Sequence, residues 1–341
     1  MSVDAPAAEF DPAALHAWLK RHVPGRLDGR MSLRRIGGGQ SNPTFFVDFD
    51  EGPSLVLRKQ PPGPLLPSAH AVDREARIIR ALAPTDVPVP EVLACCDERA
   101  VIGTPFYVMR KLEGRVLAHT SLPEIEPAGR HAYFLAMAET LARLHAVDWQ
   151  AAGLGDYGKP GNFFERQVAR WTRQWQASKG QDNPDIEHLI DWLPRHIPKG
   201  DATTIAHGDF RMGNLMFHPS EPRVVGVLDW ELSTLGHPLA DLSYCCLAWH
   251  MRPHEFDGMR GMDLAAEGIP AQEEFVAHYQ RCGGHAEPLQ PFHLAFSMFR
   301  FAVILEGVAA RARAGNAASN DAADVGAQAS AFARRAVEIV G

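Results

Sequence analysis

The feature that most constrains the fold is a change of pattern near residue 113, from β-prone runs to helical ones. Thr44 to Phe49 and Ser54 to Arg58 are β-prone runs on either side of a Glu51-Gly52-Pro53 turn, which is a hairpin pattern. Val72 to Leu82 has helical spacing, and further β-prone runs follow it as far as residue 112. This order predicts an α+β fold with a small antiparallel sheet lobe that carries one main helix, followed by a larger, mostly helical lobe.

The chain length also supports two lobes. A chain of 341 residues is long enough for about two compact units. We place the N-terminal lobe at residues 1–112, with a first helix at 12–22 and a β-rich part at 34–112, and the C-terminal lobe at 113–341. Asp11 followed by Pro12 is a typical start for that first helix, a side-chain cap and then a proline. Helical patterns in the second lobe run over Ala132–His145, Phe163–Ser178, Ile186–Leu193, Ala271–Cys282, His293–Ala312 and Ala327–Ile339.

Composition disfavours several classes of protein. The formal net charge is −7 and no basic run is longer than a dipeptide, whereas nucleic-acid binders usually carry a basic patch. Four of the five cysteines form two adjacent pairs without a Cys-x-x-Cys motif, which argues against a disulfide framework and a cysteine metal site. The N-terminus lacks a signal-peptide pattern. The most apolar stretch, His293 to Ala310, is interrupted by Arg300 and Glu306, as expected for a buried helix rather than a membrane span. We therefore expect a cytoplasmic protein with neither nucleic acid nor membrane as a partner.

A group of carboxylate and amide side chains stands out between residues 204 and 230, where two β-like runs flank polar loops. Asp209 and Asn214 share one loop, and Asp229 ends the next β-like run. Phosphoryl transfer needs a carboxylate near the nucleophilic hydroxyl and oxygen ligands that hold Mg²⁺ on the phosphates. Asp209 can face the hydroxyl, while the oxygens of Asn214 and Asp229 are hard ligands that suit Mg²⁺.

The spacing of these residues follows from a predicted hairpin. Leu215-Met216-Phe217 and Val224 to Leu228 are β-prone and are separated by a short turn. Such a hairpin would place Asn214 at its mouth and Asp229 at its exit, on the same edge. The sequence thus predicts one site, with Asp209 as the catalytic base and with Asn214 and Asp229 as metal ligands.

The string His207-Gly208-Asp209 … Asn214 … Asp229 resembles the aminoglycoside phosphotransferase and choline kinase-like families, which are relatives of protein kinases. The resemblance implies a two-lobed protein kinase-like fold, with a nucleotide-binding lobe at 1–112 and a catalytic, acceptor-binding lobe at 113–341. It also implies transfer of the γ-phosphoryl group of ATP to a hydroxyl of a small molecule, with Mg²⁺ as a cofactor. On this template Asp209 is the base, Asn214 and Asp229 hold Mg²⁺, and Asp241 braces the catalytic loop through backbone hydrogen bonds.

The same template implies a nucleotide site in the first lobe, with a glycine-rich turn, a strand cation and a helix Glu that pairs with the cation. The strand Leu55-Val56-Leu57-Arg58 aligns Arg58 with the usual Lys, which is a departure because Arg is not a neutral replacement for Lys. Side chains alternate along a strand, so Arg58 and Lys59 cannot both face the nucleotide, and the end of the apolar run favours Arg58. The residues implied in nucleotide binding, the last three of them at the interlobe hinge, are Gly38, Gly39, Ser41, Asn42, Arg58, Glu75, Met109, Arg110 and Leu112.

Two further strings narrow the resemblance. The chain looks like the kinase-like domain associated with acyl-CoA dehydrogenase family members 10 and 11 in both of them. The first is Leu57-Arg58-Lys59-Gln60-Pro61-Pro62-Gly63 … Leu66-Pro67-Ser68-Ala69-His70 … Asp73-Arg74-Glu75, and the second is Asn162-Phe163-Phe164-Glu165-Arg166-Gln167. That resemblance implies a hydroxyacyl-CoA-type acceptor, phosphorylated before its hydroxyl is eliminated. It also implies an acyl-CoA dehydrogenase as a functional partner.

Alternative functions stay open at this level. A nucleotide-binding pseudokinase scaffold without transfer activity is favoured by the Arg58 departure and disfavoured by the intact Asp209. A protein kinase is disfavoured because no Ala-Pro-Glu motif follows Asp229. Asp241 follows Pro238 at the start of an apolar run, so capping a helix is a rival to its bracing role. The sequence does not specify the acceptor, the choice between ATP and GTP, the effect of Arg58 on activity or the oligomeric state.

Overall fold

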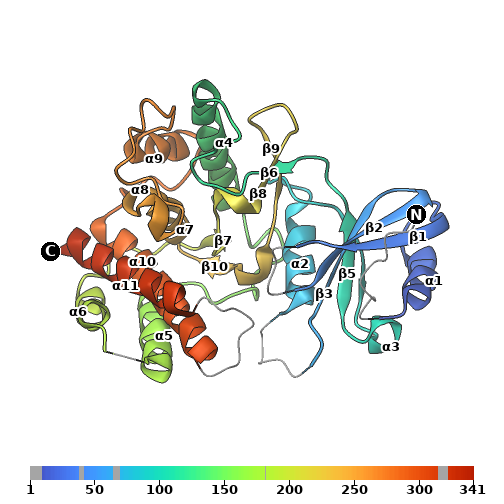
Figure 1. The fold of residues 1–341 in the computed structure, drawn as a ribbon, viewed down its shortest axis with the longest axis horizontal. Coiled ribbons are helices and arrows are strands. Elements are labelled where there is room, and N and C mark those ends of the chain that lie inside the picture. Colours follow the sequence, from blue (N-terminus) through green and yellow to red (C-terminus); the bar gives the residue numbers. More distant parts are fainter. Residues whose placement is uncertain (1–9, 38–41, 64–69, 181, 314–321) are drawn as a thin grey trace. The chain divides into compact units, whose positions relative to one another are not determined.

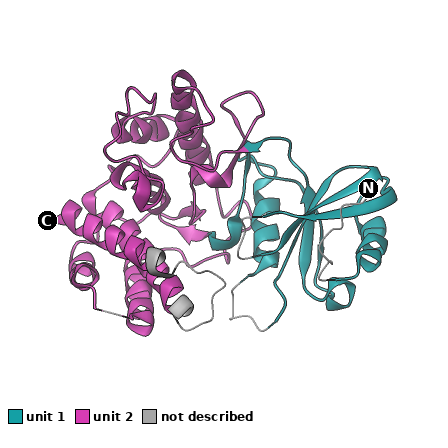
Figure 2. Ribbon diagram, viewed as in Figure 1, with its two compact units in different colours: residues 1–115, 225–233 teal, residues 116–224, 234–341 magenta. Residues whose placement is uncertain are grey.

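The computed structural model of the chain describes residues 10–37, 42–63, 70–180, 182–313 and 322–341 (Figure 1). Its internal contacts divide the chain into two compact units, coloured teal and magenta in Figure 2. The first unit consists of Met1–Arg115 and Val225–Ser233, and the second of Val116–Val224 and Thr234–Gly341. The sequence-based division after residue 112 assigns Val225–Ser233 to the second lobe. In the structure these residues pack with the first unit, because the short helix η3 (Trp230–Leu232) contacts α2 (Val72–Leu82).

The first unit is built on a five-stranded antiparallel sheet in the strand order β1-β2-β3-β5-β4. The strands are β1 (Asp28–Arg35), β2 (Thr44–Glu51), β3 (Leu55–Lys59), β4 (Val92–Cys96) and β5 (Phe106–Arg110). The hairpin of β2 and β3 confirms the sequence prediction, and its register pairs Thr44 with Arg58. β1 begins at Asp28, before the predicted β-rich start at residue 34. Most of its side chains are exposed, and only Met31 and Leu33 alternate as partly buried apolar residues, which is a short signal for a strand.

Short helices accompany this sheet. They are α1 (Pro12–His22), α2 and α3 (Arg99–Ile102). α1 follows Asp11, whose carboxylate accepts a hydrogen bond from the Ala13 N–H at 2.8 Å, and the predicted helix at 12–22 is confirmed. α1 and α2 lie on opposite faces of the sheet (Figure 1), and the core on the α1 face contains Trp18, Leu57 and Val108. The sheet therefore has two covered faces, and the α2 face carries the polar cluster described below.

The second unit is mostly helical, as the sequence predicts. Its α-helices are α4 (Pro127–His145), α5 (Phe163–Ser178), α6 (Pro184–Trp192), α7 (Pro238–Cys245), α8 (Leu247–His250), α9 (Gln272–Arg281), α10 (Pro291–Arg313) and α11 (Ala322–Val340). α10 packs against α5, α7 and α11 through buried aromatic residues such as Phe296. Among the described helices, α10 alone is long and apolar enough over Pro291–Ala310 to cross a membrane by length and composition. Of that window 67% is buried inside the protein, as in an ordinary core helix, so it is weak evidence for a membrane span.

Short strands and 3-10 turns frame the loop that carries Asp209. β7 (Thr204–Ala206) ends directly before His207 and pairs antiparallel with β10 (Thr234–Gly236). The remaining short elements are β6 (Arg115–Val116), η1 (Leu193–Arg195), η2 (Met212–Asn214), β8 (Leu215–Phe217), β9 (Val224–Val227) and η4 (Pro253–Glu255). β8 and β9 form the predicted hairpin, and its turn is closed by the His218 N–H, which donates to the Arg223 carbonyl at 2.8 Å. We call residues 207–214, between β7 and β8, the catalytic loop.

Candidate active site

The centre of the catalytic loop is the carboxylate of Asp209, which is held on both of its oxygens. Tyr244 donates its hydroxyl hydrogen to Oδ1 at 2.5 Å, and Nε of Arg211 lies 3.5 Å from the same oxygen. Asn214 donates from Nδ2 to Oδ2 at 2.7 Å. The Asp209 side chain keeps 23% of its surface exposed, so solvent or a ligand can still reach it. The loop thus presents an oriented and accessible carboxylate, as a general base requires.

Asn214 is oriented by the same contacts. Its Nδ2 donates to the backbone carbonyl of Asp209 at 2.8 Å as well as to the carboxylate. Both amide hydrogens are therefore directed at Asp209, and the side-chain oxygen is left to serve as a ligand. The single 3-10 turn η2, with the Asn214 N–H donating to the Arg211 carbonyl at 2.9 Å, folds the loop back on itself. This turn explains how two residues five positions apart come into contact.

Asp241 braces the start of the catalytic loop, as the family resemblance implies. Its two carboxylate oxygens accept backbone hydrogen bonds from His207 at 2.6 Å and from Gly208 at 2.9 Å. The rival capping role belongs to His237 instead, whose ring accepts from the Leu239 N–H at the start of α7. Burial by itself raises the pKa of Asp241, but hydrogen bonding to the ionised form and the nearby His145 and His207 lower the pKa below its usual value.

A second support of the loop comes from α10. Arg300 donates from Nη2 to the Gly208 carbonyl at 2.8 Å, so both backbone groups of Gly208 are hydrogen bonded. Gly208 has a φ of +83°, a left-handed conformation that glycine adopts without steric cost. Desolvation lowers the pKa of the Arg300 guanidinium. The loop is therefore held from α7 and α10 at the residue that precedes Asp209.

In the first unit, the α2 face of the sheet carries a cluster centred on Arg58. Its Nε donates to Glu75 Oε2 at 2.6 Å, and its Nη2 donates to Asp229 Oδ1 at 2.7 Å. Glu75, which is buried, also accepts from Asn42 Nδ2 at 2.5 Å and from the Tyr107 hydroxyl at 3.2 Å. Burial by itself lowers the pKa of Arg58, but the carboxylates of Glu75 and Asp229 raise it above the usual value. Arg58 is thus a fixed cation between two carboxylates.

The alternation along β3 decides between the two candidate cations, and the expected register is confirmed. Arg58 lies opposite Tyr107 in the sheet and faces α2. Lys59 is buried on the other face, with its ammonium group 5.6 Å from the centre of the Phe10 ring. Arg58 therefore occupies the position expected for the strand cation, and Glu75 is its helix partner.

Asp229 has an unusual backbone conformation. Its φ is +62°, in the left-handed region that residues other than glycine rarely adopt, and the turn η3 begins immediately after it. Such conformations cost roughly 1–3 kcal/mol each and cluster at functional sites. The Asp229 side chain is 38% exposed and contacts Arg58 on one oxygen, which leaves carboxylate surface for a metal ion. Oxygen ligands from an Asp and an Asn fit Mg²⁺ chemically.

The structure brings the predicted residues together in two groups. Asp209 and Asn214 are in contact in the second unit, while Asn42, Arg58, Glu75 and Asp229 form one network in the first. The meeting of the two groups around one metal ion stays a prediction.

The rest of the predicted nucleotide site is described in part. Gly38, Gly39 and Ser41 lie outside the described residues. Met109 and Arg110 end β5, and Arg110 donates from Nε to Glu91 Oε2 at 2.8 Å on the surface. Leu112 follows the strand in irregular structure.

Sequence reasoning missed the contacts that hold Asp209 and Glu75. Tyr244 lies one helical turn after Asp241 on α7, so the i, i+3 spacing is a signal that both face the same loop. Tyr107 could have been found from its place opposite Arg58 in the sheet. Arg300, far along the chain in α10, carries no comparable local signal.

The sequence matches a model of the phosphotransferase enzyme family over residues 32–284. It is 46% identical over 318 residues to acyl-CoA dehydrogenase family member 10 of Mus musculus, and the match covers 92% of this chain and 30% of that protein. A similar match to a probable acyl-CoA dehydrogenase of Arabidopsis thaliana, 42% identical, covers 97% of the chain and 43% of that protein. The chain thus spans less than half the length of these curated relatives.

Solved structures show the same architecture. A protein from Ralstonia eutropha, provisionally described as an aminoglycoside phosphotransferase, has a TM-score of 0.88 and 46% identity, with 97% of this chain and 98% of that one covered. The aminoglycoside phosphotransferase APH(4)-Ia, solved with AMP-PNP and hygromycin B, has a TM-score of 0.61 at 17% identity, with 94% and 98% covered, and shows the fold alone. The predicted kinase-like α+β fold is confirmed by these similarities.

Proposed function

Because the chain belongs to the phosphotransferase enzyme family, we propose that it transfers the γ-phosphoryl group of ATP to a hydroxyl of a small molecule in a Mg²⁺-dependent reaction. The observation that carries the proposal is the accessible Asp209 carboxylate, held by Tyr244 on one oxygen and by Asn214 on the other. A carboxylate fixed in this way can receive the proton of an acceptor hydroxyl without first having to reorganise.

The other residues of the site have distinct tasks in this proposal. Asn214 offers its amide oxygen and Asp229 its carboxylate as ligands for Mg²⁺. When bound there, Mg²⁺ supplies charge neutralisation for the phosphate oxygens. Arg58 can hold phosphate oxygens with its planar guanidinium, and Glu75 keeps that group oriented on the α2 face. Asp241 and Arg300 keep the catalytic loop in place through hydrogen bonds to its backbone at His207 and Gly208.

A second candidate is a nucleotide-binding scaffold without transfer activity. The observation in its favour is the hydrogen bond at 2.7 Å between Arg58 and Asp229, which ties the strand cation to a predicted metal ligand. A nucleotide with Mg²⁺ must compete with this contact. The held and accessible Asp209 speaks against the scaffold, because nucleotide binding alone needs no base.

For the acceptor we propose a hydroxyacyl-CoA, with an acyl-CoA dehydrogenase as the functional partner in the cytoplasm. The support is the similarity to proteins named acyl-CoA dehydrogenases, of which this chain covers only 30 to 43%. A phosphorylated hydroxyl is a better leaving group than a free one, so phosphorylation would prepare the acyl chain for elimination. The remainder of those relatives is the natural place for the subsequent chemistry on the same acyl chain.

The test is the transfer of label from γ-labelled ATP, with Mg²⁺, to a panel of hydroxyacyl-CoAs, aminoglycosides, choline and simple sugars. Asp209→Asn is the control, because it keeps the shape of the side chain and removes the base. We expect a labelled product with the native protein and nucleotide binding without product in the variant. Equal product formation by the variant would refute Asp209 as the base. Nucleotide binding without a labelled product from any acceptor would favour the nucleotide-binding scaffold. This includes hydroxyacyl-CoAs that are assayed together with an acyl-CoA dehydrogenase.

A further inference from the structure

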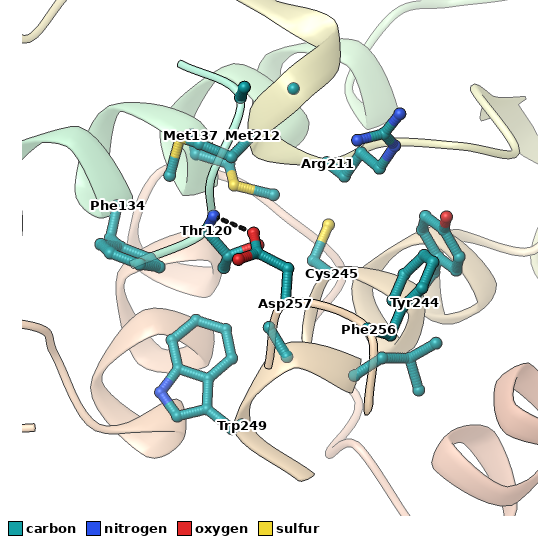
Figure 3. Close-up of a pocket in the computed structure, with 14 residues that line it drawn as sticks. Thr120, Phe134, Met137, Arg211, Met212, Tyr244, Cys245, Trp249, Phe256 and Asp257 are labelled. Carbon is teal, nitrogen blue, oxygen red and sulfur yellow. Dashed lines mark hydrogen bonds between the residues drawn. The ribbon is translucent and has the colours of Figure 1, made fainter. Parts of the chain in front are cut away.

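A cavity of about 230 Å³ lies in the second unit beside the catalytic loop (Figure 3). Its walls come mainly from α4, from the start of η2 and from the α7–α8 region. Its apolar lining side chains include Phe134, Met137, Met212, Cys245, Leu247 and Trp249. None of these apolar side chains has a role in the phosphoryl transfer proposed for this chain.

Two polar side chains of the lining, Arg211 and Tyr244, lie on one side of the cavity. Figure 3 shows Arg211 and Tyr244 on the side opposite Phe134 and Trp249. Both of these polar side chains contact Asp209, Tyr244 through its hydroxyl at 2.5 Å and Arg211 through Nε at 3.5 Å. A ligand with its apolar part in the cavity would therefore have its polar end next to the proposed base.

A strained loop forms part of the cavity wall. Phe256 has a φ of +117° and Asp257 a φ of +52°, two consecutive residues other than glycine in the left-handed region. The Asp257 carboxylate accepts the Thr120 N–H at 2.5 Å, a contact drawn in Figure 3, and lies 3.3 Å from His119 Nδ1. Backbone strain of this kind persists only where surrounding contacts impose it, and it is concentrated at functional sites. The strain is thus a second observation, independent of volume, that marks this cavity.

The chemistry of the lining favours a hydrocarbon over a sugar. Of the two charged side chains in the lining, Asp257 is already engaged by Thr120, and Arg211 lies beside Asp209. The hydroxyls and ammonium groups of an aminoglycoside would find few partners among Met and aromatic side chains, and unpaired buried polar groups are costly. An alkyl segment has no such groups, and each methylene that it buries gains free energy.

Resting on the proposed phosphotransferase function, we propose that this cavity binds the apolar part of the acceptor and limits its length. An apolar cavity of about 150 Å³ holds one benzene ring. A cavity of about 230 Å³ has room for roughly half as much again, about nine carbon atoms. The occupant is an unbranched alkyl segment of up to this length, with its hydroxyl at Asp209 and its chain directed toward Phe134 and Trp249.

The experiment measures binding of straight-chain 1-alkanols, from propanol to dodecanol, to the full chain by isothermal titration without ATP. We expect the dissociation constant to fall by about fourfold for each added methylene until the cavity is full, near nine carbons, and then to level off. Because binding is measured without catalysis, a failure of phosphoryl transfer would not affect this result. Dissociation constants that do not depend on chain length would overturn the proposal.

Two substitutions with opposite effects make the test specific to the cavity. Met137→Ala removes three heavy atoms from the wall and should move the limit to longer chains by about three carbons, on the same volume argument. Ala248→Leu adds three carbons to the wall and should move the limit to shorter chains by a similar amount. Met298→Ala is the matched control, since Met298 is a fully buried methionine of α10 outside the cavity lining.

The control should lose stability without any shift of the chain-length limit. A limit that is the same in all four proteins would overturn the assignment of the cavity. So would a limit that moves in the same direction in Met137→Ala and Ala248→Leu.

Discussion

Removal of the Asp241 carboxylate tests how the catalytic loop is held. In Asp241→Ala, the backbone N–H groups of His207 and Gly208 lose their acceptors, which they contact at 2.6 and 2.9 Å. Both donors are buried, and each unsatisfied buried donor costs about 1–3 kcal/mol. The variant should therefore lose about 2–6 kcal/mol of stability in the second unit. That is a large share of the roughly 5–15 kcal/mol that stabilises a typical domain.

Asp148 offers a matched control for this prediction. Its Oδ1 also accepts two backbone hydrogen bonds, from Gln150 and Ala151 at 3.0 Å each, but at an exposed site. Water can replace the acceptor there, so Asp148→Ala should cost about 1 kcal/mol or less. The two aspartates make the same number of backbone contacts but differ in burial, and Asp241 also lies 3.5 Å from His145 Nε2.

The assay is scanning calorimetry combined with labelled phosphoryl transfer. At roughly 2–4 °C per kcal/mol for a unit of this size, Asp241→Ala should lower the melting temperature by at least about 4 °C, and Asp148→Ala by about 4 °C at most. Transfer should fall by at least about a hundredfold in Asp241→Ala, because small misplacements of Asp209 are costly. Equal melting temperatures for the two variants would refute the reasoning from burial. Full transfer activity in Asp241→Ala would refute the bracing role.

Further predictions concern the same two groups of residues. Tyr244→Phe keeps the ring and removes the hydroxyl that donates to Asp209, so kcat should fall by about tenfold, equivalent to about 1.4 kcal/mol, with little change in melting temperature. A kcat equal to that of the native protein would show that the hydroxyl does not support the base. Because the pKa of Asp241 is lower in the folded than in the unfolded chain, its stabilisation is complete above its unfolded pKa of about 3.9 and is lost as pH falls through the folded pKa. Acid unfolding followed by circular dichroism should therefore show a smaller difference between the native protein and Asp241→Asn at pH 3 than at pH 6. Asp229→Ala should abolish Mg²⁺-dependent nucleotide binding, and an unchanged affinity in a titration with Mg²⁺-ATP would contradict its role as a ligand. Glu75→Gln should weaken nucleotide binding by about tenfold, since the Arg58 guanidinium loses its charged partner on α2, and the same titration measures it.

Short-range rules were sufficient for the parts of the structure that depend on neighbouring residues. The alternation of side chains along β3 separates Arg58 from Lys59, and the structure places them on opposite faces of the sheet. The hairpin of β2 and β3 and the cap of α1 at Asp11 follow from turn and capping chemistry within a few residues. In each case the stabilising contact lies close in sequence to the residue that signals it.

The bounds of elements with little contrast between two faces could not be predicted in this way. Every residue of α7 from Pro238 to Cys245 is buried, so its sequence has no polar face and no clear helical period. β1 has the opposite problem, because most of its side chains are exposed. The bounds of the helix and the start of the strand were therefore missed, although an apolar helix was expected in the run after Pro238.

Contacts between distant residues were the other part that local patterns could not supply. Tyr244, which holds the Asp209 carboxylate, is 35 positions away from it, and Arg300 is 92 positions away from Gly208. Likewise, nothing in the sequence of Val225–Ser233 indicates that these residues pack with the first unit. The resemblance supplied the brace at Asp241, and the spacing of Tyr244 from Asp241 is a signal that was not used, whereas the arginine required the structure.

Because Val225–Ser233 belong to the first unit, the proposed metal ligand Asp229 and the proposed base Asp209 are positioned by different units. Asp229 is positioned by Arg58 and by the contact of η3 with α2, all within the first unit. Asp209 is positioned by Tyr244, Asn214 and the braced loop, all within the second. Asp229 takes these contacts from the first unit and Asp209 takes its contacts from the second. Substitutions in one set should therefore change the task of that set first. Loss of nucleotide binding and loss of the base are therefore separable defects, and a protein that has lost only one of them can still report on the other.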